Sequence, residues 1–128
     1  GTLVGFCVLG GAFAEGVDLK GEKLIGTIIV GTGLPKMCSE LNILSEYFEK
    51  TRDNGRDYAY TYPAMIKVEQ AAGRVIRSET DRGVVVLVDD RYAEPSAYRL
   101  FPKNWRHIKY TGDPYSLNTA LCRFWGEK

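Results

Sequence analysis

The 128-residue sequence predicts an α/β fold in which helices flank a mostly parallel sheet. Short aliphatic runs, rich in β-branched residues and ended by glycine or acidic residues, indicate strands covered on both faces, as in parallel sheets. Segments with apolar residues at helical spacing lie between and after these runs. Hydrophobic residues make up 45% of the chain and charged residues 26%, which permits a packed core and excludes global disorder. A domain typically has about 100–200 residues, so we expect one domain.

Three aliphatic runs are the predicted strands. The first covers residues 3–9 and ends at Gly10, and the second covers residues 24–30 and ends at Gly31. The third covers residues 84–88 and runs into the acidic pair Asp89 and Asp90. Residues 108–110 are a further strand candidate. A sheet of three or four strands is thin for a doubly wound domain, so we expect a piece of a larger protein.

The predicted helices lie between and after the strands. Ser39 can cap a helix over residues 40–50, and Asn54-Gly55 marks a turn in the polar segment that follows. A long helix is expected over residues 63–77, with Pro63 in its first turn. Shorter helices are expected over residues 95–100 and 114–124. No internal domain boundary is visible in residues 1–128.

Charge and composition exclude several classes of protein. Seventeen basic and sixteen acidic residues leave a net charge of +1, which excludes a strongly basic nucleic-acid-binding chain but not a local basic patch. No apolar run approaches the ~18 residues of a membrane span, so we expect no membrane partner. The three cysteines, an odd number at wide spacings, indicate a reducing compartment, so we expect a cytoplasmic location. Three widely spaced cysteines and the lone His107 offer no metal-ligand spacing, so no metal site is expected.

Residues 65–77 carry the most informative pattern. At about 100° per residue, the predicted helix has one apolar side and an opposite side without acids. The apolar side, the predicted core face, consists of Met65, Val68, Ala72, Val75 and Ile76. The opposite side consists of Lys67, Gln70, Arg74 and Arg77. Two arginines about one turn apart beside a glutamine suit a polyphosphate, because guanidinium groups match phosphate oxygens; a solvated helix face is the alternative.

A glycine-rich loop follows the first predicted strand. Residues 10–19, GGAFAEGVDL, place two acids at the carboxyl end of a strand, where ligands bind in open α/β sheets. The loop has neither the G-K-S/T ending of a phosphate-binding loop nor the G-x-G-x-x-G pattern. Asp18 is a candidate acceptor for a ribose hydroxyl, a magnesium-bound water or an arginine. The alternative is a structural turn with a helix-capping carboxylate.

Together these segments resemble a known family. Residues 10–18 are similar to helicase motif V of the DinG/XPD family of superfamily 2 helicases, and residues 70–77, QAAGRVIR, are similar to motif VI. The following residues 78–92 also match the family's stretch after motif VI. Residues 31–35 and 58–63 resemble bacterial DinG-type proteins more than XPD. The resemblance covers about residues 3 to 105.

The resemblance implies a fold and a function. It makes residues 1–128 the C-terminal part of the second RecA-like lobe of an ATP-dependent DNA helicase, with motif V at about 10–19 and motif VI at about 70–77. This chain would share ATP and Mg²⁺ with the first RecA-like lobe of the same protein, and single-stranded DNA would be the second partner. Without the first lobe we expect no activity. The family also implies 5′→3′ polarity.

Site residues follow from the same resemblance. Arg74 and Arg77 correspond to motif VI arginines that face the nucleotide phosphates, one of them as the arginine finger. Gln70 belongs to the same interface. The motif V residues Glu15, Gly16 and Asp18 couple the nucleotide site to the DNA track; we assign Gly16 and Asp18 to the nucleotide side and Glu15 to the DNA side. Asp81 either orients a motif VI arginine or is a turn acid before Gly83.

Candidate DNA contacts lie elsewhere. Thr32 and Lys36 follow the second strand and share the carboxyl edge of the sheet. A basic stretch interleaved with aromatic residues is either a nucleic-acid patch or a solvated face with its rings packed inward. Its members are Arg99, Lys103, Arg106 and Lys109, with Phe101, Trp105 and Tyr110. For the chain as a whole, the alternative function is a non-enzymatic nucleotide- or nucleic-acid-binding module that retains a RecA-like lobe.

Overall fold

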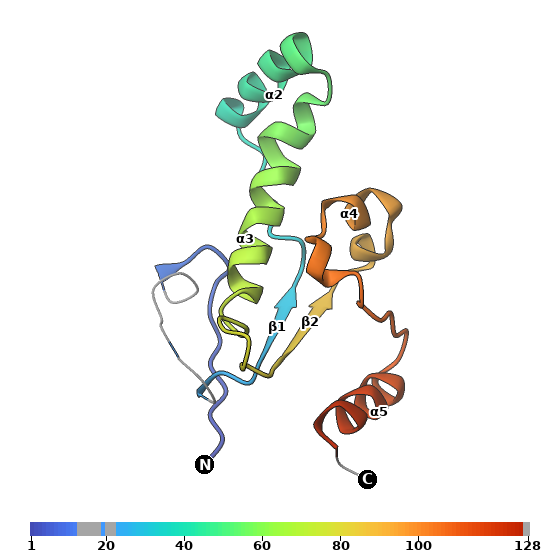
Figure 1. The fold of residues 1–128 in the computed structure, drawn as a ribbon. Coiled ribbons are helices and arrows are strands. Elements are labelled where there is room, and N and C mark those ends of the chain that lie inside the picture. Colours follow the sequence, from blue (N-terminus) through green and yellow to red (C-terminus); the bar gives the residue numbers. More distant parts are fainter. Residues whose placement is uncertain (13–18, 20–22, 127–128) are drawn as a thin grey trace. The chain divides into compact units, whose positions relative to one another are not determined.

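The computed structural model describes residues 1–12, 19 and 23–126, shown in Figure 1. The chain divides into two compact units, Gly1–Glu94 and Pro95–Lys128. The first unit holds a sheet and its covering helices, and the second holds short helices. Helices and a parallel sheet in one chain confirm the predicted α/β class.

The sheet of the described residues consists of two parallel strands, β1 (Gly26–Val30) and β2 (Val84–Val88). Their register pairs Gly26 with Val84 and Val30 with Val88, and both strands lie within the aliphatic runs that predict them. Helix α3 (Tyr62–Ala72) packs against β1, and Ile29 is buried in that contact layer. The alternate residue Ile28 remains 69% exposed, so among the described residues one face of the sheet is covered and the other is open, whereas the sequence predicted cover on both faces.

Helix α2 (Ser39–Arg52) turns back sharply into the next helical segment. The turn uses Asp53 and Asn54, both with positive φ, before Gly55. The Gly55 N–H donates to the Glu49 carboxylate at 2.6 Å. A Cβ on Gly55 would meet the backbone of Ser45, so only glycine permits this close approach. Ser39 begins the helix rather than capping it, because Cys38 occupies the N-cap position.

The helix predicted to start near residue 63 begins earlier. A π-helical segment, η2 (Asp57–Thr61), leads directly into α3. The Tyr62 N–H reaches back to the Asp57 carbonyl, and Pro63, which has no N–H to donate, follows at the start of α3. Against α2, the Tyr60 hydroxyl donates to the Asn42 side chain at 2.7 Å. Part of the polar segment after α2 is therefore helical.

The predicted extension of this helix to residue 77 is wrong. Helix α3 ends at Ala72, and Gly73 is its C-cap. Met65, Val68 and Ala72 are buried as predicted, and Val75, beyond the helix, is 3% exposed. Ile76, predicted for the core face, is 46% exposed because the chain has left the helix by then.

Two predicted strands do not form. Residues 3–9 contain no strand, and Phe6 is 97% exposed. Residues 108–110 are also irregular. An aliphatic run becomes a strand only where a neighbouring edge supplies hydrogen bonds, and within the described residues neither segment has such a neighbour.

The second unit contains α4 (Pro95–Leu100), the 3₁₀ turn η4 (Lys103–Trp105) and α5 (Pro114–Trp125). Asp113 caps α5 by accepting from the Ser116 N–H at 2.9 Å and the Ser116 hydroxyl at 2.6 Å. Pro114 occupies the first turn, and Gly126 ends the helix in the left-handed conformation. Both predicted helices of this region are confirmed. The connecting 3₁₀ turn η3 (Asp90–Ala93) belongs to the first unit.

Candidate functional site

A hollow lies at the carboxyl end of α3. It has a volume of about 470 Å³ and is lined by Gln70, Gly73, Arg74 and Arg77. Of the four residues on the predicted cationic side, three therefore share one concave surface, although the helix ends before two of them. Glycine in the lining leaves room for a ligand to approach the main chain.

Residues 73–75, which follow α3, form tight turns that place Arg74 in the lining of this hollow. The Gly73 N–H donates to Glu69 O at 2.8 Å in the helical pattern. The Arg74 N–H then donates to Ala71 O at 3.3 Å and the Val75 N–H to Ala72 O at 3.1 Å, each one residue shorter than an α-helical bond. The buried side chain of Val75 anchors this turn in the core. Arg74 is thus held by its neighbours on both sides.

Arg77 is held differently. Its main-chain N–H donates to the Asp81 carboxylate at 2.8 Å, and the Ser78 N–H donates to the same oxygen at 2.9 Å. These bonds lower the pKa of Asp81, so the group is a carboxylate at neutral pH. Of the two alternatives for Asp81, its contacts support a turn acid that also fixes the arginine-bearing main chain.

The lining has the chemistry of an anion site. Two guanidinium groups and one amide supply N–H donors, and these four lining residues include no carboxylate. Guanidinium groups stay charged at all physiological pH values and match phosphate oxygens in pairs. The donor set therefore fits a polyphosphate.

The first residue of the segment that resembles motif V, Gly10, lies against a side chain of α3. Lys67, on the same side of α3, runs over Gly10: a Cβ on Gly10 would lie 3.4 Å from Lys67 Cδ. Lys67 therefore packs on the start of the glycine loop and does not line the hollow. The predicted motif V residues Glu15, Gly16 and Asp18 lie outside the described residues.

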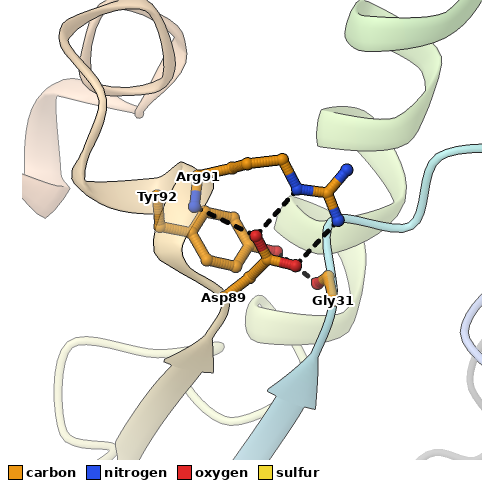
Figure 2. Close-up of polar contacts among 4 residues, drawn as sticks. All are labelled: Gly31, Asp89, Arg91 and Tyr92. Atoms are coloured by element: carbon orange, nitrogen blue, oxygen red, sulfur yellow. Dashed lines mark hydrogen bonds and ion pairs between the residues drawn. The ribbon is translucent and has the colours of Figure 1, made fainter.

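A polar cluster of Gly31, Asp89, Arg91 and Tyr92 lies at the carboxyl ends of β1 and β2, as Figure 2 shows. Asp89 follows β2 and accepts from the Arg91 side chain at 2.8 and 2.7 Å and from the Arg91 main-chain N–H at 3.0 Å. The buried Tyr92 donates its hydroxyl hydrogen to Gly31 O at 2.7 Å, across 61 residues of sequence. Burial raises the pKa of Tyr92 to about 12, so the hydroxyl stays protonated and remains a hydrogen-bond donor. The cluster ties together the carboxyl ends of β1 and β2.

Asp89 is expected to make stability depend on pH. The Arg91 hydrogen bonds lower the pKa of Asp89 from 3.8 to about 2. A lowered folded-state pKa stabilises the fold above the unfolded value, and this contribution is lost as the pH falls from 3.8 towards 2. The Arg91 side chain is 50% exposed, so we expect Asp89→Asn to lower the unfolding free energy by about 0.5–1 kcal/mol at pH 7.

Urea unfolding of both chains from pH 7 to pH 2 measures this effect. The difference between them should be constant down to about pH 4 and then shrink. Asp90→Asn is the matched control, since it removes the neighbouring carboxylate and should change stability less. A difference that persists unchanged at pH 2 would contradict the assignment.

The predicted DNA contacts Thr32 and Lys36 lie in the loop that this cluster anchors. Gly31 begins the loop at φ 83°, and its N–H donates to Val88 O at 3.0 Å. The Thr32 hydroxyl oxygen is buried and has no hydrogen-bond partner among the described residues. Lys36 is exposed. A side-chain contact from Thr32 to DNA would therefore require the loop to open, whereas Lys36 is already accessible.

The basic stretch of the second unit shows features of both alternatives. Phe101 packs on Trp105 and on Tyr98, with ring centroids 5.6 and 6.1 Å apart. Two of its interleaved rings are thus engaged with other rings, as a solvated face requires, while Tyr110 is 55% exposed. The cations are all exposed: Arg99, Lys103, Arg106 and Lys109.

Other chemical groups offer little in the described ranges. The thiols of Cys7, Cys38 and Cys122 form no disulfide, and Cys7 is exposed. Within residues 1–12, 19 and 23–126, no group of three histidine, cysteine or acidic side chains is arranged to hold a metal ion. No helix in that part of the chain combines the length and apolarity needed to cross a bilayer.

The roles of Asp89, Arg91 and Tyr92 were not predicted from sequence. In the sequence, Asp89 marks the end of the third aliphatic run, and all three residues belong to the stretch after motif VI. An acid two residues before an arginine, directly after a strand, is a local signal for the ion pair. The Tyr92 bond to Gly31 has no local signal, because its partners are distant in sequence.

Known proteins share this sequence pattern. The family model described as "Helicase C-terminal domain" matches residues 1–108. The chain is 36% identical over 95 residues to the ATP-dependent DNA helicase chl-1 of Caenorhabditis elegans, covering 73% of this chain and 11% of that protein. It is 32% identical over 115 residues to the general transcription and DNA repair factor IIH helicase subunit XPD of Schizosaccharomyces pombe, covering 87% and 14%.

A bacterial relative is similarly close. The ATP-dependent DNA helicase YoaA of Haemophilus influenzae is 31% identical over 105 residues, covering 80% of this chain and 16% of that protein. The chain thus spans less than a fifth of the length of these relatives.

Proposed function

Because the chain belongs to the helicase C-terminal domain family, we propose that it forms part of the second RecA-like lobe of an ATP-dependent DNA helicase. In this proposal it supplies the arginine side of an ATP site that lies between two lobes. The first lobe of the same protein supplies the rest of that site. The DinG-like type and 5′→3′ movement belong to the same proposal.

The observation that carries the proposal is the hollow beyond α3. Gln70, Arg74 and Arg77 meet there around Gly73, so the donors suited to phosphate oxygens lie on one surface. The relatives named as ATP-dependent DNA helicases support ATP as the polyphosphate. Scattered surface arginines would not leave a shared concave lining.

The charge placement suggests how the hollow works. ATP bound to the first lobe presents its terminal phosphate, and the guanidinium groups of Arg74 and Arg77 stabilise the negative charge that develops during transfer. These contacts favour the closed arrangement of the lobes. Hydrolysis and phosphate release remove them, so the lobes part, and alternation of the two states moves the protein along one DNA strand.

Other residues have assigned places in this scheme. Mg²⁺ would be held with the first lobe, where it neutralises phosphate charge. Gly16 and Asp18 of motif V complete the nucleotide side, and Glu15, Thr32 and Lys36 contribute to the DNA track. Lys36 is the member of the track that is exposed in the described structure.

ATP hydrolysis by the full-length protein tests the proposal. We expect turnover that rises when single-stranded DNA is added, and no turnover by the 128-residue chain alone. Strand displacement on duplexes with a 5′ or a 3′ single-stranded extension then measures polarity. Displacement only from the 5′ extension supports 5′→3′ movement.

The same assays separate the alternative function. A non-enzymatic module would bind nucleotide or DNA in the full-length protein without hydrolysing ATP. That result would refute the motor assignment and favour a binding role for the hollow.

A further inference from the structure

The main chain at Arg77 needs a support other than the helix. Helix α3 ends at Ala72, and the shortened turns that follow reach only to Val75. Arg77 nevertheless lines the same hollow as Gln70 and Arg74. Arg77 lies two residues beyond Val75, where the last of those turns ends, so its position depends on contacts made further along the chain.

Asp81 makes these contacts. One of its carboxylate oxygens accepts from the Arg77 N–H at 2.8 Å and from the Ser78 N–H at 2.9 Å. The Asp81 N–H in turn donates to Ser78 O at 3.2 Å. The segment from 77 to 81 is therefore a closed turn in which two main-chain N–H groups converge on the Asp81 carboxylate.

We propose that Asp81 is a positioning residue of the nucleotide site: its carboxylate fixes the main chain at Arg77 and so places the Arg77 guanidinium in the hollow. This inference rests on the function proposed above. Asp81 itself contributes no atom to the lining of the hollow. Its effect is transmitted through the two N–H groups that it binds.

Aspartate suits this task for two reasons. Its short side chain reaches backbone N–H groups three and four residues earlier, as acids do in capping turns. Its negative charge strengthens both hydrogen bonds and attracts the arginine that it positions. Glu79 lies within the same turn and is exposed, and the Arg77 and Ser78 N–H groups bond to Asp81 instead, so Glu79 supplies a matched acid for comparison.

Kinetics of the full-length protein test the inference. We expect Asp81→Ala to lower kcat for ATP by about 10- to 100-fold, because a misplaced catalytic group commonly costs that much, with a smaller change in KM. Asp81→Asn keeps an oxygen acceptor for the two N–H groups and should restore most of the lost turnover. Glu79→Ala should match the wild type.

A double-variant cycle distinguishes positioning from general stability. If Asp81 acts through Arg77, Asp81→Ala should cause no further loss in a protein that already carries Arg77→Ala. An equal further loss would show that Asp81 acts independently and would overturn the inference. If Asp81→Ala does not fold, the milder Asp81→Asn and its own cycle with Arg77→Ala decide the matter.

The remaining outcomes separate the two proposals. Normal turnover by Asp81→Ala, together with defective Arg77→Ala, would overturn positioning and leave the helicase function intact. If the wild type hydrolyses no ATP, the proposed function fails and the positioning role falls with it. If Arg77→Ala is fully active in a protein whose wild type hydrolyses ATP, the positioning role alone is overturned.

Discussion

Replacing both Arg74 and Arg77 by alanine in the full-length protein is expected to lower ATP turnover by about 10³-fold or more, since an arginine finger contributes about 10³–10⁵ to phosphoryl transfer. Both residues line the hollow and neither belongs to the buried core. The unfolding free energy should therefore change by about 1 kcal/mol or less. Steady-state ATP hydrolysis with saturating single-stranded DNA measures the first effect, and urea unfolding measures the second.

Single variants identify the finger. The arginine that contacts the transferred phosphate should account for most of the loss, and its replacement by lysine should remain strongly defective, because an ammonium lacks the paired N–H geometry. Arg52→Ala is the matched control: it removes the same charge from the last turn of α2, away from the hollow. Full turnover by the double variant would refute the role of the hollow.

Much of the first unit followed from local sequence. Uninterrupted aliphatic runs identified β1 and β2, although the described residues cover only one of the two faces that such runs lead one to expect to be covered. The grouping of Gln70, Arg74 and Arg77 also followed, although the helix ends at Ala72. The shortened turns after Ala72 still rotate the chain in the helical sense, so Arg74 stays near Gln70.

The structural features that the sequence did not predict correctly depend on partners distant in the chain. The aliphatic residues 3–9 have strand propensity, but a strand requires a paired edge that a local pattern does not contain. The end of α3 at Ala72 is not visible in the pattern, because the apolar period continues to Val75, which packs near Gly83. The Tyr92 bond to Gly31 joins two loops through the fold of the sheet. Each is decided by tertiary contacts.

Gly83 links the core to the arginines, and Gly83→Ala should therefore damage both stability and turnover. A Cβ at this position would clash with Val75 Cγ1 and lie 3.0 Å from the carbonyl oxygen of Ile25, the residue before β1. The Ile25 oxygen already accepts from the Val84 N–H at 3.0 Å, so the strand cannot retreat without weakening the sheet. Val75 must shift instead, and Arg74 is its direct neighbour.

We expect Gly83→Ala to lower the unfolding free energy by about 1–3 kcal/mol, as overpacking of a filled core usually does, and to lower ATP turnover of the full-length protein. Gly112→Ala is the control, because apart from its chain neighbours no atom of the described residues lies within 4 Å of a Cβ added there. Val75→Ala removes the clashing methyl group, so the double variant should be more stable than the sum of the two single losses implies. Additive losses in urea unfolding would mean that Gly83 does not act through Val75, and the link between the packing of this turn and the placement of Arg74 would then have to be abandoned.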